Sequence, residues 1–430
     1  MPRNPIQIKP SERNAFRLHL AYSILDGLIL GILALNEFVF IKSLKGSEYQ
    51  LSVLFQLTTV LLIFSVFFHE IIRRAKNKRR MIRITAIITR LPLLLLLFFP
   101  SQPEAYADQP YFHYLFLAIF LMYYLANPIV FPVINRLLKS NYSHENFGRL
   151  YSRATTWNKI VMISVTLLYG LLLDYDSSAF RYVFPVAAAL GITSVFLLTR
   201  IKEKEVVEEE EIRSGLWHAV KDSIRRMFSI LKTNKPYQHF EWGFMLYGFA
   251  FMSTISVITI FFDRALGLNY SGVAFYKNTY NIISIFLFPL FGRLIGRIDP
   301  RRFAAITFFS MMMFLLFLIV TEHFPYFTTV WGIKLFWMMI PYIIFQSLFA
   351  ATMGLLWSIG SVYFCKKEEA EIYQAIHLTM TGERALFAPL LGMLFYTLAG
   401  FTFTFAVGAG MLAAGVVVMF WSMKKFPVNK

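Results

Sequence analysis

Long apolar segments constrain the fold of this chain more than any other feature of its sequence. A transmembrane helix needs about 20 predominantly apolar residues, and 57% of the 430 residues are hydrophobic while only 16% are charged. A soluble domain does not need so much apolar surface. Twelve segments stand out, at 16–41, 50–70, 82–99, 111–134, 152–174, 181–199, 240–262, 272–292, 303–320, 331–354, 373–398 and 401–421. The sequence therefore predicts an all-α polytopic membrane protein with twelve transmembrane helices.

The basic residues predict how the chain is oriented in the membrane. The net charge of +17 is concentrated in alternate connections between the apolar segments, above all at 73–83. The opposite connections carry few basic residues, chiefly Lys42, Lys45, Arg181 and Arg264. Because cytoplasmic loops of membrane proteins are enriched in Lys and Arg, we expect both termini in the cytoplasm. The positive charge then has a topological explanation, and no nucleic-acid partner is expected.

Several other classes of protein find no support in the sequence. The single cysteine, Cys365, excludes an intramolecular disulfide, and the eight histidines lack ligand spacing, so neither a metal nor a cofactor is predicted. No His-Glu-x-x-His, Gly-x-Ser-x-Gly or paired Asp motif lies within the apolar segments, so no enzyme is expected. The first segment is too long for the apolar region of a cleaved signal peptide. The short loops favour a multi-pass protein of the bacterial inner membrane, and we expect a monomer.

The sequence repeats itself weakly at a nearly constant offset. A shift of 222 residues aligns 40–44 with 262–266, and the same shift places Lys78-Arg79-Arg80 on Pro300-Arg301-Arg302. A shift two or three residues larger brings the tract 151–159 onto the tract 373–383. Internal symmetry of this kind is typical of transporter folds. We therefore predict two pseudo-symmetric six-helix halves, at 1–199 and 240–430.

A charged stretch at 200–239 separates the predicted halves. It opens with the acidic run Glu208-Glu209-Glu210-Glu211. Further on, apolar residues recur at helical spacing on one face, and basic residues take the other. The apolar set is Leu216, Val220, Ile224, Met227, Phe228 and Leu231, and the basic set is Lys221, Arg225, Arg226 and Lys232. This pattern predicts an amphipathic helix on the inner leaflet, with a regulatory partner helix as the alternative.

In this organisation the chain resembles the major facilitator superfamily, whose loop signature runs Gly-x-Leu-x-Asp-Arg-x-Gly-Arg-Lys/Arg. The copy after the eighth segment is Gly292-Arg293-Leu294-Ile295-Gly296-Arg297-Ile298-Asp299-Pro300-Arg301-Arg302. Gly292, Leu294, Arg297, Arg301 and Arg302 match the signature, whereas Gly296 stands in place of its Asp. The copy at 70–80 keeps the basic cluster, including Arg79 and Arg80, and lacks both Gly and Asp. The resemblance implies that the first, fourth, seventh and tenth spans face a central cavity, flanked by the second, fifth, eighth and eleventh.

Two ionisable neighbours, Glu383 and Arg384, lie near the middle of the eleventh predicted span. Each charge at that depth costs about 2.5 to 3.5 kcal/mol, which a helix that only anchored the chain would not carry. Adjacent residues of a helix point about 100° apart, so the two side chains cannot fully satisfy each other. We therefore place both on a substrate or ion pathway.

Asp26 in the first span and Lys159 in the fifth form a second candidate pair, because both lie at a similar depth. A salt bridge between them would offset the penalty that each charge carries alone. The pair is interpreted either as a proton-linked gate or as a static bridge between two helices. In the first span, Gly27 and Gly31 also predict a close helix-packing face.

Uncharged polar residues near mid-depth complete the candidate pathway. They are Asn127 in the fourth span, Asn278 and Asn281 in the eighth, and Gln346 in the tenth. These residues either bind substrate or hydrogen-bond between helices, and the sequence leaves both interpretations open. Arg90 in the third span is expected to extend toward the inner surface and keep its charge in water.

These features favour a secondary active transporter that moves a small organic solute by alternating access. Basic residues inside the membrane favour an anion or a zwitterion as substrate, and protonation of Asp26 or Glu383 would couple transport to a proton gradient. The expected partners are thus a small-molecule substrate, protons and the lipid bilayer. Sodium coupling remains open, and the alternative function is a transporter-like sensor or a lipid scramblase or flippase without coupled solute transport.

Overall fold

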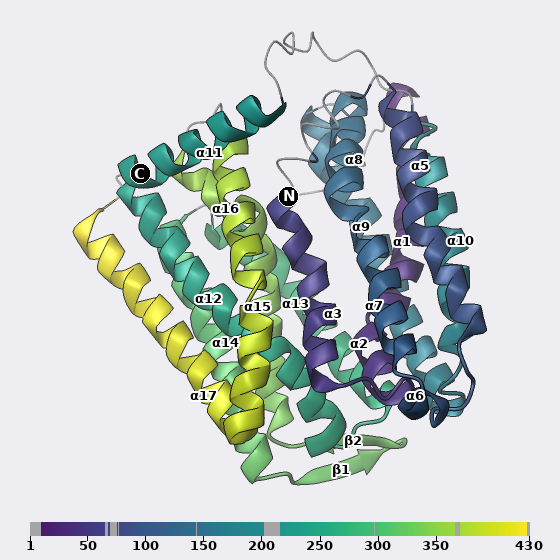
Figure 1. The fold of residues 1–430 in the computed structure, drawn as a ribbon. Coiled ribbons are helices and arrows are strands. Elements are labelled where there is room, and N and C mark those ends of the chain that lie inside the picture. Colours follow the sequence, from purple (N-terminus) through teal and green to yellow (C-terminus); the bar gives the residue numbers. More distant parts are fainter. Residues whose placement is uncertain are drawn as a thin grey trace, which may run out of the picture. The chain divides into compact units, whose positions relative to one another are not determined.

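The computed structural model describes residues 10–64, 68, 75, 77–142, 144–201, 216–295, 297–365 and 370–427, and nearly all of them are helical (Figure 1). Among these residues, nine helical stretches are long and apolar enough to cross a membrane. One of them, Ile372–Lys425, has 54 residues. At 1.5 Å rise per residue it is about 80 Å long, enough to cross a hydrocarbon core of about 30 Å twice. The chain is therefore a multi-pass membrane protein.

A break at Gly400 divides the last of these stretches. Gly400 has φ 78° and ψ −170° inside helix α17 (Ala388–Lys425), a conformation that residues with a side chain rarely adopt. Two further helices fall on predicted spans: α13 (Tyr270–Ile295), and α3 (Glu48–Val60) with its 3₁₀ extension to Phe64. The all-α fold of the major facilitator type is confirmed, and its predicted count of twelve spans agrees with these elements.

The chain forms two compact units. The first contains 1–45 and 66–214, and the second contains 46–65 and 215–430. Helix α3 thus clusters with the second unit, where it packs on α12 (Lys235–Ile260), α16 (Ala370–Ala385) and α17. A buried hydrogen bond of 3.2 Å joins Ser52 on α3 to Ser256 on α12. The domain boundaries at residues 199 and 240 stay a prediction.

The first unit is built from helices packed around an apolar core. Its elements are α1 (Pro10–Leu33), α2 (Asn36–Phe38) with a π-helical turn at Val39–Ser43, α5 (Lys78–Arg90) with a 3₁₀ turn at Leu91–Phe98, α6 (Ala105–Asp108), α7 (Tyr111–Tyr124), α8 (Asn127–Asn141), α9 (His144–Tyr175) and α10 (Phe180–Leu198). Helix α1 packs along both α9 and α10. One cluster of its core includes Phe16, Ile82 and Leu198, which come from three different helices.

The second unit adds eight further elements to α3, α12, α16 and α17. They are α11 (Leu216–Thr233), a π-helical turn at Phe261–Ala265, α13, α14 (Pro300–His323), β1 (Phe327–Val330), β2 (Ile333–Phe336), α15 (Met339–Ile359) and a 3₁₀ turn at Ser361–Phe364. Helix α17 packs along both α12 and α14. Within this unit the β1–β2 hairpin lies at the end opposite α11 and the C-terminal segment (Figure 1).

The hairpin corrects one predicted boundary. The tenth span was predicted to begin at residue 331, but α15 begins at Met339 and an antiparallel pair, β1 and β2, precedes it. Trp331 has φ 49° and Gly332 has φ 78°, as the two central residues of a type I′ hairpin turn require. The apolar run at 333–336 was mistaken for the start of a helix because short strands and helix segments share the same hydropathy.

Local structure repeats at the offset of 222 residues that the sequence predicted. The π-helical turn Val39–Ser43 recurs as Phe261–Ala265. A left-handed residue with φ 55° follows each turn: Lys45 follows the first and Gly267 the second. The helix N-caps recur at the same offset. They are Ser47 and Asn269, which accept from the amides of Gln50 and Gly272, and Asn77 and Asp299, which accept from those of Arg80 and Arg301. The six-helix duplication is therefore a property of the backbone.

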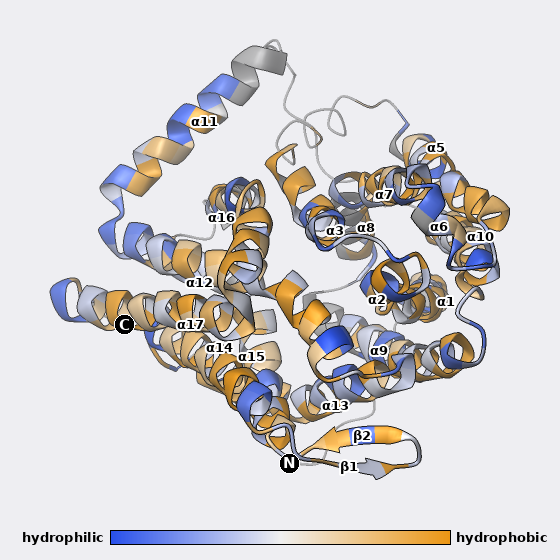
Figure 2. Cartoon of the chain, turned by 60° about the horizontal axis from the view of Figure 1, so that its bottom comes forward, coloured by the Kyte–Doolittle hydropathy of each residue, from blue (hydrophilic) through white to orange (hydrophobic). Residues whose placement is uncertain are grey.

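Helix α11 agrees with the amphipathic helix predicted in the linker. Ile224 and Phe228 are exposed, as are Lys221, Arg225 and Arg226. Figure 2 shows hydrophilic and hydrophobic residues alternating along this helix, in contrast to the mainly hydrophobic helices of the rest of the second unit. The acidic run at 208–211 lies outside the described residues.

Candidate functional site

Arg384 is a charged side chain in the interior of the second unit. It lies in the last turn of α16 and is only 2% exposed. One terminal nitrogen donates to the carbonyl of Phe244 on α12, and the other donates to the hydroxyl of Thr381 at 3.2 Å. The guanidinium also lies 5.7 Å from the centre of the Tyr247 ring, within range of a cation–π contact. Its direct polar contacts with the described residues are therefore all made with neutral groups.

The neighbouring helix makes room for this guanidinium with a glycine. A Cβ added at Gly248 on α12 would lie 1.9 Å from Cζ of Arg384, closer than atoms can approach. The Nε of Arg384 is buried and has no acceptor among the described residues. An unpaired buried donor costs about 1 to 3 kcal/mol, and more when it is charged. Arg384 thus keeps one donor available for a further acceptor.

The structure separates the adjacent pair that the sequence places on one pathway. Glu383 is exposed, and its side chain makes no hydrogen bond or ion pair with another described residue. The helix ends directly afterwards, since Leu386 and Phe387 lie between α16 and α17. The side chain of Gln56 on α3 donates to the carbonyl of Leu386 at this break. Only Arg384 of the pair contributes to the interior.

Asp26 in the first unit has a different partner from the predicted one. Its Oδ2 accepts a hydrogen bond of 3.0 Å from the side-chain amide of Asn158 on α9, and the same amide donates to the carbonyl of Ser23 at 2.9 Å. Lys159 is half-buried and makes no ion pair with Asp26. The helix turns by about 100° per residue, which directs Asn158 rather than Lys159 toward α1. The predicted Asp26–Lys159 bridge is therefore wrong.

Glycines bring α1 close enough to α9 for this contact. A Cβ added at Gly27 would lie 2.5 Å from the carbonyl oxygen of Asn158, and one at Gly31 would lie 2.7 Å from that of Met162. Neither position accommodates a side chain without backbone movement. The predicted packing face of these two glycines is confirmed, and it places Asp26 against α9.

Arg90 lies inside the first unit and does not extend to the surface as predicted. It is 9% exposed, donates to the hydroxyl of Thr89 at 3.0 Å, and lies 5.5 Å from the ring centre of Tyr123. A Cβ at Gly191 on α10 would lie 2.8 Å from its side chain, so a glycine again makes room for an arginine. Arg90 also interacts electrostatically with Asp26. Sequence position alone gave no signal of the glycine on another helix.

The sequence-based reasoning missed a buried acid and base in the second unit. Glu241 on α12 is 1% exposed and His377 on α16 is 2% exposed. The Nδ1 atom of His377 lies 3.0 Å and 3.2 Å from the two carboxylate oxygens of Glu241. Glu241 was overlooked because it falls at the start of the predicted seventh span, where a carboxylate is expected to reach water. Its burial depends on α16, which is more than a hundred residues away in the sequence.

The uncharged polar candidates come from other helices, α8, α13 and α15. Asn127 is the first residue of α8, directly after the break that separates α8 from α7. The Oε1 of Gln346 is buried without a donor among the described residues, whereas Asn281 donates to the carbonyl of Lys277 at 2.7 Å. Asn278 is buried and has polar interactions of its own. Their roles in a pathway stay a prediction.

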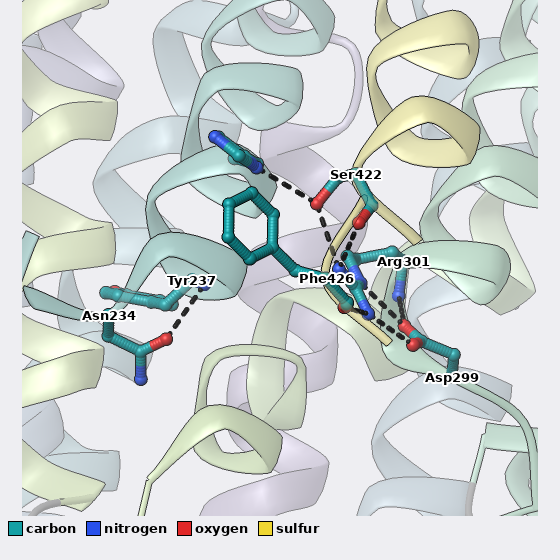
Figure 3. A network of polar contacts seen from close by, with 7 residues as sticks. Asn234, Tyr237, Asp299, Arg301, Ser422 and Phe426 are labelled. Atoms are coloured by element: carbon teal, nitrogen blue, oxygen red, sulfur yellow. Dashed lines mark hydrogen bonds and ion pairs between the residues drawn. The ribbon is translucent and has the colours of Figure 1, made fainter. Parts of the chain in front are cut away.

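A carboxylate occupies the N-terminus of α14, three residues after the position of the signature's Asp. Asp299 caps α14 and binds the guanidinium of Arg301 at 2.7 Å (Figure 3). Arg301 is fully buried and also donates to Ser422 and to the carbonyl of Phe426, both at 2.9 Å. The cluster joins α14 to the end of α17. The other signature residues differ in exposure: Gly292, Arg297, Arg302 and Arg80 are exposed, and Arg79 is half-buried.

A comparison with models of known protein families identifies the family of this chain. A family model described as Major Facilitator Superfamily matches residues 20–382. The chain belongs to the Major Facilitator Superfamily. It is thus a membrane transporter of this superfamily, as the loop signature and the duplicated helices indicated. No curated protein matches the sequence.

Solved structures of superfamily members share the fold at low sequence identity. The nucleoside transporter NupG has a TM-score of 0.66 and 16% identity, covering 98% of this chain and 100% of its own. A POT family transporter in complex with 5-aminolevulinic acid has a TM-score of 0.69 and 14% identity, covering 99% of both chains. A D-xylose–proton symporter has a TM-score of 0.61 and 14% identity, covering 95% and 96%. These similarities concern the fold.

Proposed function

We propose that this transporter is a secondary active carrier of a small organic anion or zwitterion, driven by a proton gradient. The observation that carries the proposal is the buried Arg384, which has a free donor and only neutral direct partners. A charge kept in a membrane interior at such cost usually marks a substrate or ion pathway. Guanidinium groups match the geometry of carboxylates and phosphates, which favours an acidic group on the solute.

Proton coupling needs a group that changes its charge inside the membrane. In the first unit Asp26 has one neutral hydrogen-bond partner, Asn158, and interacts electrostatically with Arg90. Protonation of Asp26 would leave Arg90 without this compensating charge and so favour a different arrangement of α1, α5 and α9. In this proposal, alternating access follows from a ligand and a proton that bind one conformation better than the other.

The orientation is part of the proposal. We place α11 and both termini in the cytoplasm, because the basic residues of the connections then lie on the side where Lys and Arg are enriched. We also place the protein in a bacterial inner membrane as a monomer. Labelling of Cys365, the single cysteine, by a membrane-impermeant maleimide tests the orientation: inside-out vesicles should label and right-side-out vesicles should not.

The decisive experiment measures uptake of labelled solutes into proteoliposomes. The solutes form a pool of lactate, succinate, glutamate, dialanine and 5-aminolevulinic acid, with uridine as the uncharged comparison. Each solute is tested with and without an imposed pH gradient. We expect at least one acidic or zwitterionic solute to accumulate only with the gradient, and Asp26→Asn to lose that accumulation. Binding without accumulation would instead indicate a sensor, and accumulation driven only by a sodium gradient would refute proton coupling.

A further inference from the structure

Glu241 and His377 form a buried ionisable pair to which the proposed function assigns no role. Aromatic rings enclose the imidazole, since the ring centres of Phe244 and Trp357 lie 4.7 Å and 4.9 Å from it. The Nε2 atom of His377 is buried and has no hydrogen-bond partner among the described residues. With Nδ1 donating to the carboxylate, a neutral imidazole keeps its lone pair on Nε2. That atom is therefore free to take up a proton.

The pair is connected to Arg384 along one helix face. His377 and Arg384 are seven residues apart on α16, two turns on the same side. Thr381 lies between them, accepting from Arg384 at 3.2 Å and donating to the carbonyl of His377 at 2.8 Å. On α12, Glu241 precedes Phe244, whose carbonyl binds Arg384, by one turn. Glu241 and Arg384 also interact electrostatically.

The charges of Glu241, His377 and Arg384 balance in only one protonation state. When His377 is neutral, the negative charge of Glu241 compensates the positive charge of Arg384. Adding one proton at Nε2 of His377 leaves a net charge of +1 in a site of low dielectric, where an uncompensated charge is strongly unfavourable. Other ionisable groups near the pair are Tyr237, Tyr373 and Cys365. At neutral pH these groups are uncharged and do not change this balance.

We propose that Glu241 and His377 form a second protonation site of the transporter, in addition to Asp26, and that their protonation makes Arg384 the binding site for an oxyanion of the solute. A carboxylate or phosphate would restore the charge balance and accept from the unpaired Nε. The inference deepens the proposed function and rests on it. Proton and anion then favour each other's binding by the same factor, because coupling between two ligands is reciprocal. The proton comes from one aqueous side and is released on the other.

The first test uses the acidic solute that wild-type protein accumulates in the pool experiment. Glu241→Gln and His377→Gln are compared with two matched controls in the same unit, Glu322→Gln and His323→Gln. We expect the first two variants to lose gradient-driven accumulation at least about tenfold while keeping solute exchange at equal pH, and both controls to behave like wild type. Wild-type accumulation and pH dependence in Glu241→Gln and His377→Gln would refute the inference and leave the proposed function standing. No accumulation by the wild type would instead refute the proposed function.

The second test measures proton binding directly and does not depend on a gradient. The same solute is added to the detergent-solubilised protein in weakly buffered solution with a pH indicator dye. We expect wild-type protein to take up about one proton more per molecule than Glu241→Gln does. If Glu241→Gln does not fold, His377→Gln decides the outcome, and Glu241→Asp should restore the uptake because it keeps a carboxyl group. Equal proton uptake in the wild type and in the folded variant would overturn the assignment.

Discussion

The two sequence halves share a backbone plan and differ in the charges that they bury. At an offset of 222 residues they repeat a π-helical turn, a left-handed residue and two helix N-caps. At the same offset, Asp26 corresponds to Gly248. In the first unit Asp26 contacts Asn158 on α9, whereas in the second Gly248 makes room for Arg384 on α16. Duplication thus preserved the helix geometry while the interior charges diverged.

The N-caps of α5 and α14 give the largest expected difference in stability between the halves. Asp299→Ala removes a cap and also leaves the fully buried Arg301 without its carboxylate, so we expect a loss of about 3 to 5 kcal/mol. Asn77→Ala removes only a cap, at about 1 kcal/mol. Thermal unfolding in detergent should show the larger decrease in Tm for Asp299→Ala. Equal decreases would show that the Arg301 cluster adds nothing beyond the cap.

Gly248 gives the next largest effect. Gly248→Ala brings a Cβ onto the guanidinium of Arg384, and overpacking of this kind costs about 1 to 3 kcal/mol. Gly410→Ala on α17 is the matched control, because a Cβ there meets nothing within 4 Å. We expect a lower Tm for Gly248→Ala only. An unchanged Tm would mean that Arg384 moves away from Gly248 without cost.

The left-handed residues give the smallest effect, and its sign differs between the two halves. Gly267 adopts φ 55° without strain, whereas Lys45 adopts the same angle with a side chain, which costs about 1 kcal/mol. Lys45→Gly should therefore raise the Tm slightly, and Gly267→Ala should lower it. A decrease for Lys45→Gly would indicate that its side chain stabilises the turn by a contact that outweighs the strain.

Hydropathy and local signals were enough to predict the spans and the repeat, but not the partners of the buried charges. The π-helical turns depend on neighbouring residues, so their offset was visible in the sequence as the match of 40–44 with 262–266. The choice of Asn158 over Lys159 depends on helix rotation, and one residue changes the direction by about 100°. The burial of Arg90 depends on Gly191, and that of Glu241 on His377. Contacts between distant segments leave no periodic signal in either partner.

The most direct test of the account compares the two adjacent residues that the structure separates. Uptake of the accumulated acidic solute is measured in proteoliposomes for wild type, Arg384→Gln and Glu383→Gln. We predict a loss of at least about tenfold for Arg384→Gln, because a charged hydrogen bond contributes about 1.5 to 3 kcal/mol, and near wild-type uptake for the exposed Glu383→Gln. Full uptake by Arg384→Gln, or loss of uptake only in Glu383→Gln, would contradict the account.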